Sequence, residues 1–236
     1  MLTILAVVIT LRAASVKAQV TNLVESANGN YCINFSDYKG GPIEQWIEAR
    51  GFKFAQDAKN SKLLSLSITD QVLTLDAKGR MTGLILNDSL DLRDVKKVKI
   101  TWGVLKYPVD VSYENKVNNE ALMLYFFFGK EKISSGHLLV PNSPYFIGLF
   151  LCHDDQVDVP YKGRYFHTGG RFVCRAKPSP GDTIVSEFNL DRNFKRYFGK
   201  KEMPNITGIG LGVDTSKAGG DGTASAFLKS IEFLKD

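Results

Sequence analysis

The feature that most constrains this chain is its succession of about ten strand-length segments separated by turn residues. Segments 63–68 and 98–104 alternate apolar and polar residues, so each has one apolar face. Segments 121–129 and 145–152 are apolar throughout, which is typical of strands covered on both faces. Strands do not alternate with helices, and no repeat or low-complexity segment is present. The pattern predicts an all-β protein, a jelly-roll-like antiparallel β-sandwich with one short helix near the C-terminus.

The predicted helix lies at the start of the C-terminal stretch 189–233. Asp191 is its expected N-cap, because a carboxylate accepts hydrogen bonds from the free amides of a first turn. Phe194 and Phe198 share one face and are expected to be buried. Gly199 supplies the left-handed residue that ends a helix.

The strand that follows carries glycine at every second position, at Gly208, Gly210 and Gly212. These glycines leave one face of the strand bare. A bare face indicates the close approach of another backbone, an aromatic ring or a ligand.

This C-terminal stretch resembles a secreted bacterial family catalogued only as domain-of-unknown-function family 3047. The resemblance rests on the order of an aromatic–Gly helix end, a Pro, an Ile-Thr-Gly strand, Asp-Thr, a Gly-rich turn and an Ile-x-Phe ending. Three further segments fit in order, so the resemblance covers roughly residues 31–236: ITWGV at 100–104, NNEALMLYFFFG at 118–129 and FVCRA at 172–176. Family members tend to carry an Asp pair where this chain has Asn118 and Asn119. The resemblance implies a β-sandwich and a periplasmic address, and no established activity.

The N-terminus is typical of a signal peptide over residues 1–18. A ten-residue apolar run, too short to span a bilayer, precedes Val16 and Ala18 at the small-residue positions of a cleavage site. Cleavage after Ala18 leaves a single domain over 19–236. No later apolar run approaches membrane length, so a periplasmic or secreted protein without a transmembrane span is expected.

The net charge is too small to indicate nucleic-acid binding. It is +5 for the whole chain and +3 once residues 1–18, which hold two cations and no acid, are removed. Polyanion binding normally shows clustered Lys and Arg on one face. A glycan or an envelope protein is the partner expected instead.

Export makes disulfides chemically accessible. Cys152 and Cys174 follow apolar strands on either side of one long loop, so they are expected to pair across a hairpin, leaving Cys32 unpaired. The alternative is that all three cysteines are buried small apolar residues.

Three clusters are candidates for chemistry. His153 and Asp154, with Asp155 and Asp158, combine an imidazole with carboxylates, and His167 lies near the other end of the same loop. They could bind a cation or supply an acid and a base, while the alternative is a solvated loop.

Asp214 and Asp221, in the closing Gly-rich loop, suit calcium weakly, because turn chemistry alone explains them. Trp102 and Tyr125, with Phe127, could stack on sugars or could belong to the core.

Two functions follow from these residues. The first is an exported non-catalytic binding or structural module that engages a glycan, an envelope polymer or a partner protein, without a cofactor. The second is a periplasmic polysaccharide hydrolase or lyase that uses the loop of His153, Asp154 and His167, with Arg164 or Arg171 holding a substrate carboxylate.

Overall fold

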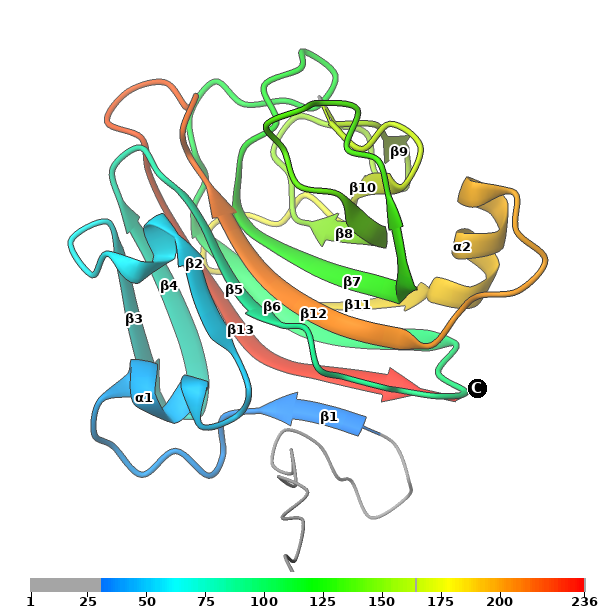
Figure 1. Cartoon of the computed structure of the whole chain (residues 1–236). Coiled ribbons are helices and arrows are strands. Elements are labelled where there is room, and N and C mark those ends of the chain that lie inside the picture. Colours follow the sequence, from blue (N-terminus) through cyan, green and yellow to red (C-terminus); the bar gives the residue numbers. More distant parts are fainter. Residues whose placement is uncertain (1–30, 164, 236) are drawn as a thin grey trace, which may run out of the picture.

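Two β-sheets pack face to face and make a sandwich (Figure 1). The structure is a computed structural model that describes residues 31–163 and 165–235. The predicted signal peptide and Arg164 lie outside the described residues. The all-β sandwich expected from the sequence is confirmed.

The six-stranded sheet has the order β11-β6-β13-β4-β3, with β1 also paired to β13. Its strands are β1 (Tyr31–Asn34), β3 (Leu64–Thr69), β4 (Val72–Lys78), β6 (Lys97–Lys106), β11 (Ile184–Asn189) and β13 (Thr223–Leu234).

The seven-stranded sheet has the order β2-β5-β12-β7-β8-β10-β9. Its strands are β2 (Lys53–Gln56), β5 (Thr82–Asn87), β7 (Glu120–Ile133), β8 (Ser143–Phe150), β9 (Pro160–Tyr161), β10 (Gly170–Cys174) and β12 (Ile206–Asp214). Figure 1 shows β12 and β7 curving, with β8, β9, β10 and their loops gathered on the concave side.

One pairing departs from the predicted antiparallel arrangement. β8 and β10 are parallel, with Gly170 opposite Phe146 and Cys174 opposite Phe150. The long segment between these strands carries the chain back across the sheet before β10 begins, and parallel strands need a crossover of that kind.

The core between the sheets follows the period-2 pattern of β6. Val98, Ile100, Trp102 and Val104 are at most 2% exposed. The sugar-stacking role suggested for Trp102 is therefore wrong. Its ring lies between the sheets, and its Nε1 donates a hydrogen bond to Ser186 Oγ at 3.1 Å.

The helix α2 (Leu190–Phe198) lies where the sequence predicts it. Its N-cap is Asn189, whose side chain accepts from the Arg192 amide at 2.8 Å, and not Asp191, which pairs with Lys195 one turn later. Phe194 is fully buried, whereas Phe198 is only half-buried. Gly199 ends the helix with a φ of 65°, as expected.

A second helix of six residues, α1 (Ile43–Glu48), follows Pro42 and was not predicted from the sequence. Ile43 and Ile47 lie four residues apart and are buried together, so their packing stabilises a helix too short to persist alone. A 3-10 turn, η1 (Asp57–Lys59), follows β2.

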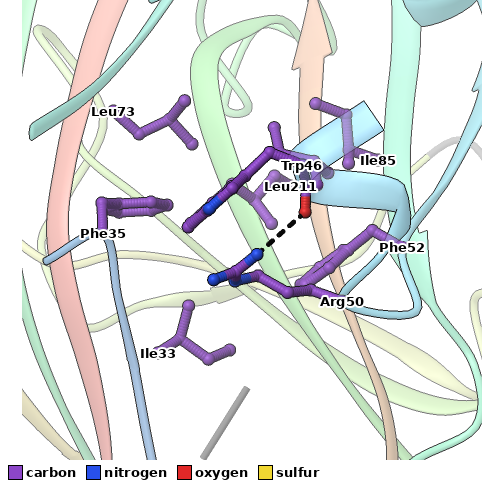
Figure 2. Close-up of a pocket in the computed structure, with 9 residues that line it drawn as sticks. Ile33, Phe35, Trp46, Arg50, Phe52, Leu73, Ile85 and Leu211 are labelled. Carbon is purple, nitrogen blue, oxygen red and sulfur yellow. Dashed lines mark hydrogen bonds between the residues drawn. The ribbon is translucent and has the colours of Figure 1, made fainter. Parts of the chain in front are cut away.

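A gap of about 20 Å³ lies beside α1, against the core (Figure 2). The Arg50 guanidinium stacks on the Trp46 ring, with 3.5 Å from Cζ to the ring centroid, and donates to the Trp46 carbonyl oxygen at 3.2 Å. The gap has room for about one water molecule, so it is a packing defect and not a ligand site.

Candidate functional site

The seven-stranded sheet is covered on both faces, because its outer face carries a second apolar cluster. On β7, Leu124 and Phe126 point into the sandwich, while Met123, Tyr125 and Phe127 belong to the outer cluster. The buried members of this cluster are Tyr113, Met123, Phe146, Phe150, Cys152, Phe172 and Cys174. The complete apolarity of β7 and β8 therefore results from two apolar neighbours, one on each side.

Cys152 and Cys174 form a disulfide within this cluster, with their Cα atoms 5.7 Å apart. The pair is the one expected from the sequence, but it joins the ends of parallel strands and not a hairpin. Cys32 is unpaired and half-buried.

A cleft of about 640 Å³ opens on the outer face of the sheet. We call it the outer-face cleft. Its aromatic lining is Tyr113, Tyr125, Phe127, Phe146, Tyr165, Phe166 and Phe172. Its charged lining residues, within the described part of the chain, are Glu120, Asp214 and Lys217. The volume and the mixture of an apolar floor with few polar groups are typical of ligand sites.

The glycines of β12 give the aromatic floor its shape. A Cβ on Gly212 would come 2.7 Å from Tyr125 Cε2, and one on Gly210 would come 2.9 Å from a Leu84 methyl group. A Cβ on Gly208 would meet the Asn87 carbonyl oxygen at 2.9 Å. The bare face expected from the sequence is thus occupied in part by the rings of Tyr125 and Phe127.

Two carboxylates meet at one end of the cleft. Asp214, the last residue of β12, lies opposite Glu120, the first residue of β7. A β-bulge shifts the register between Gly212 and Asp214, so this pair lies beside an irregular step of the ladder. Residues paired across antiparallel strands have their Cβ atoms about 4.5–5.5 Å apart. Glu120 is 4% exposed, and its Oε2 accepts from the Tyr113 hydroxyl at 2.8 Å.

The Asp214 carboxylate is held through one oxygen. Oδ1 accepts from the Ser216 hydroxyl at 2.7 Å, the Asn119 amide group at 2.8 Å, the Ser216 backbone amide at 2.9 Å and the Thr82 hydroxyl at 3.3 Å. These donors stabilise the ionised form. Oδ2 has no such partner in the described part of the chain.

Burial is the largest cause of the pKa shifts in this group of side chains. It raises the pKa of Glu120 well above its usual value of 4.5; the nearby Asp214 carboxylate adds to the rise and the Tyr113 hydrogen bond opposes it. Burial also raises the pKa of Asp214, against the hydrogen bonds of Ser216 and Thr82. The pKa values of Tyr113 and Tyr125 are raised by burial and then by Glu120.

Asn118 and Asn119 occupy the position of the expected acidic pair. Asn119 joins β7 to the closing loop, since it donates to Asp214 and its Oδ1 accepts from the Lys217 amide at 2.8 Å. Asn118 lines the cleft, and its Nδ2 is buried without a partner among the described residues. A buried donor of this kind is costly unless a ligand or water satisfies it.

The His153 end of its loop does not contribute to the cleft, whereas Tyr165 and Phe166, near the other end, line it. His153 and Asp154 are exposed, contact each other at 2.8 Å from Nδ1 to Oδ1, and do not line it. Their neighbour Asp155 is buried and accepts from the Ser112 hydroxyl at 2.7 Å, so it fixes the loop. The hypothesis of an acid–base site in this loop is therefore not supported.

The other predicted residues are divided between the cleft and other parts of the molecule. Tyr125 and Asp214 line the cleft, whereas His167 and Asp221 do not. Asp221 is exposed and accepts from Thr223. Arg171 donates to the His167 and Tyr197 carbonyl oxygens, so it anchors the chain beside α2.

The described residues contain no group of three or more His, Cys, Asp or Glu side chains placed to hold a metal ion. Calcium at Asp214 and Asp221 thus remains a prediction from the sequence. Within the same residues, no helix has the length and hydropathy needed to cross a membrane.

Sequence reasoning did not single out Glu120 or Tyr113. The available signal was an acid that directly precedes the most apolar strand of the chain. Nothing in the sequence places that acid beside Asp214.

No family model and no curated protein matches this chain. Among solved structures, it is similar to the potassium-bound carbohydrate recognition domain of Emp46p, with 10% identity over 86% of this chain and 96% of that one, at a TM-score of 0.43. It is also similar to endoglucanase 3 of Trichoderma harzianum, from family GH12, with 10% identity over 88% and 98% and a TM-score of 0.39. A mutant of the carbohydrate-binding module CBM29-2 has 9% identity over 87% and 93% and a TM-score of 0.36. At TM-scores this low, the likenesses carry no argument about function.

Proposed function

We propose that this protein is an exported glycan-binding β-sandwich protein that binds its ligand in the outer-face cleft. The observation that carries the proposal is the aromatic floor of a 640 Å³ cleft that has polar groups at one end. Aromatic faces pack against the C–H faces of sugar rings, while amide and carboxylate groups orient the hydroxyls.

The charges of the cleft favour a neutral glycan. Glu120 and Asp214 lie side by side at one end, and Lys217 is the only described lining residue that carries a positive charge. A polyanion would be repelled by an ionised carboxylate held in a partly buried site. The same argument disfavours nucleic acid.

The proposal of export is supported by the disulfide. Cys152 and Cys174 are oxidised, and structural disulfides are rare in reducing compartments. N-terminal sequencing of protein recovered from the envelope or the medium is expected to begin at Gln19. Recovery of a chain that still begins at Met1 would contradict this part of the proposal.

The binding proposal is tested by isothermal titration calorimetry against soluble neutral polysaccharides, namely a mixed-linkage glucan, a xylan, a glucomannan and a dextran, with polygalacturonate as an anionic comparison. We expect Tyr125→Ala to weaken binding of the neutral ligand by at least about tenfold, which corresponds to about 1.4 kcal/mol. Tyr107→Ala is the matched control, because Tyr107 is a half-buried tyrosine that lies outside the cleft.

A second variant changes the floor without removing an aromatic ring. Gly212→Val places side-chain atoms where the Tyr125 ring lies, so it is expected to displace that ring and weaken binding. Gly79→Ala is the control, since the nearest atom to its added Cβ is 4.0 Å away. Equal binding by all four variants, or absence of binding to every neutral polysaccharide, would refute the proposed site.

A further inference from the structure

The proposed glycan site also contains the parts of a hydrolytic centre, and this inference rests on the proposed function. We propose that Glu120 and Asp214 cleave a glycosidic bond of the glycan bound in the outer-face cleft, with Glu120 as general acid and Asp214 as nucleophile. The basis is their direct opposition across β7 and β12, at the end of an aromatic-lined cleft.

The surroundings of Glu120 suit an acid. Glu120 is only 4% exposed, and it lines the cleft. Oε2 accepts from the Tyr113 hydroxyl, while Oε1 has no partner among the described residues. A proton on this carboxyl therefore belongs on Oε1, the oxygen left free for a ligand.

The surroundings of Asp214 suit a carboxylate that stays ionised. Four donor contacts converge on Oδ1, from Ser216, Asn119 and Thr82. Among the described residues, Oδ2 has no donor, which leaves it free to form a bond. Two carboxyl groups in unequal environments separate into one protonated and one ionised member, and this division of roles is what acid-assisted glycoside cleavage needs.

The reaction balances with water as the only co-substrate. Asp214 Oδ2 forms a bond to the anomeric carbon while the glycosidic C–O bond breaks, and the leaving oxygen takes the proton from Glu120. Water then bonds to the anomeric carbon and gives a proton to the Glu120 carboxylate, and the bond to Asp214 breaks. Opposed cross-strand residues place the carboxyl groups close together, as in enzymes that retain the anomeric configuration, where the separation is about 5–5.5 Å.

Neighbouring groups have supporting positions. The Tyr113 hydroxyl orients Glu120. Asn119 donates to Asp214, and the half-buried Tyr125 belongs to the aromatic floor of the same cleft. Tyr113 and Asn119 are positioning residues in this scheme.

The test measures binding and turnover on the same proteins with the same neutral polysaccharides. Reducing ends released by the wild type are expected to fall by at least about 100-fold in Glu120→Gln and in Asp214→Asn, the loss typical of a missing acid or nucleophile. Binding of the polysaccharide by these variants is expected to remain measurable, because the aromatic floor of the cleft is unchanged. Asp221→Asn, an exposed acid outside the cleft, is the control.

The two roles are separated by a dinitrophenyl glycoside of the sugar that binds, because its leaving group needs no protonation. Glu120→Gln is expected to recover most of the wild-type rate of bond cleavage on this probe, whereas Asp214→Asn is not. Proton NMR of the first product is expected to show a retained anomeric configuration.

Failure of this inference is distinguishable from failure of the proposed function. Binding by the wild type without any release of reducing ends overturns catalysis and leaves the glycan site intact. Turnover that persists in Glu120→Gln and Asp214→Asn, or inverted product, overturns the assigned roles. If circular dichroism shows that either variant is unfolded, the wild type alone provides the test. Turnover with a retained anomeric configuration then supports the inference, and absence of turnover or an inverted product overturns it.

Discussion

At the scale of single residues, Glu120 is the most unusual group in the described structure. It is a carboxyl buried at the start of the most apolar strand, and within the described part of the chain the Tyr113 hydroxyl is its one hydrogen-bond donor. Burial of an ionised carboxylate costs free energy, so the folded protein holds the proton more tightly than the unfolded chain does. The stability of the fold is therefore linked to pH through this side chain.

The sign of the linkage gives a prediction. The folded-state pKa of Glu120 is raised above its usual value of 4.5. At pH values between 4.5 and the raised pKa, the folded protein therefore holds a proton that the unfolded chain has released. The stability that the folded protein gains by holding this proton is fully present below pH 4.5. It is lost as the pH rises through the folded-state pKa of Glu120. Glu120→Gln, which stays neutral, is expected to melt at a higher temperature than wild type at neutral pH, with the difference shrinking as the pH falls toward 4.5.

The measurement is the melting temperature of both proteins between pH 4 and 8 by differential scanning calorimetry. Each unit of raised pKa corresponds to about 1.4 kcal/mol in the free energy of unfolding. Glu187→Gln, a change at an exposed residue paired with Lys97, is the control and is expected to show no such convergence. A constant difference between Glu120→Gln and wild type across this range would show that Glu120 titrates normally.

At the scale of elements, the amphipathic helix α2 is attached to the sandwich by an aromatic side chain that it packs into the core. Phe194 is fully buried and contacts Phe128 of β7, with 4.9 Å between the ring centroids. Tyr145 of β8 and Phe198 lie around the same ring. The helix is thereby attached to the strands that carry the cleft, and its stability depends on one aromatic anchor.

Truncation of that anchor is expected to be costly. Phe194→Ala is expected to lower the free energy of unfolding by about 3–5 kcal/mol, because it removes a large buried ring and leaves a cavity. Chemical denaturation followed by tryptophan fluorescence measures the loss. Phe198→Ala is expected to cost less, since Phe198 is half-buried, and Arg196→Ala, at an exposed position, is the neutral control.

An equal loss from Phe194→Ala and Phe198→Ala would contradict the burial of the helix as described. An unchanged midpoint for Phe194→Ala would show that α2 is peripheral to the fold.

At the scale of the whole molecule, the seven-stranded sheet has two apolar faces and only one partner sheet. The second face is covered by loops over the cluster of Tyr113, Phe146, Phe150 and Phe172. The disulfide between Cys152 and Cys174 ties β8 to β10 beneath these loops. The loops are thus held by a covalent link where no second sheet packs.

Removal of this link is expected to destabilise the whole domain. The closed segment has a sequence separation of 22, and a loop of that length corresponds to about 3 kcal/mol by the chain-entropy account. The double variant with Cys152→Ser and Cys174→Ser is expected to lose about that free energy of unfolding in urea, and the reductant dithiothreitol is expected to have the same effect on wild type. Cys32→Ser is the control, because Cys32 is unpaired.

Mass mapping of wild type without reductant should show one linked peptide pair containing Cys152 and Cys174. Three free thiols in protein prepared without reductant would contradict the bridge.

The sequence by itself determined the elements of this protein. Period-2 alternation, apolar runs and turn residues depend on local geometry, so they predicted β3, β6, β7, β8 and β12 close to where they lie. They also predicted the inward face of β6, the end of α2 at Gly199 and a close approach of another group to the glycines of β12. The short helix α1 and the parallel direction of β10 were not predicted, because tertiary packing decides the first and the path of a long loop decides the second.

Only the tertiary structure decided the site. Alternation shows that residues share a face, but not which neighbour covers it, so Trp102 proved to lie in the core while Tyr125 lines a cleft. The conspicuous polar residues His153 and Asp154 lie outside that cleft, and the inconspicuous Glu120 lies in it. The pairing of Glu120 with Asp214 depends on the register of β7 against β12, a contact between distant parts of the chain that no local pattern encodes.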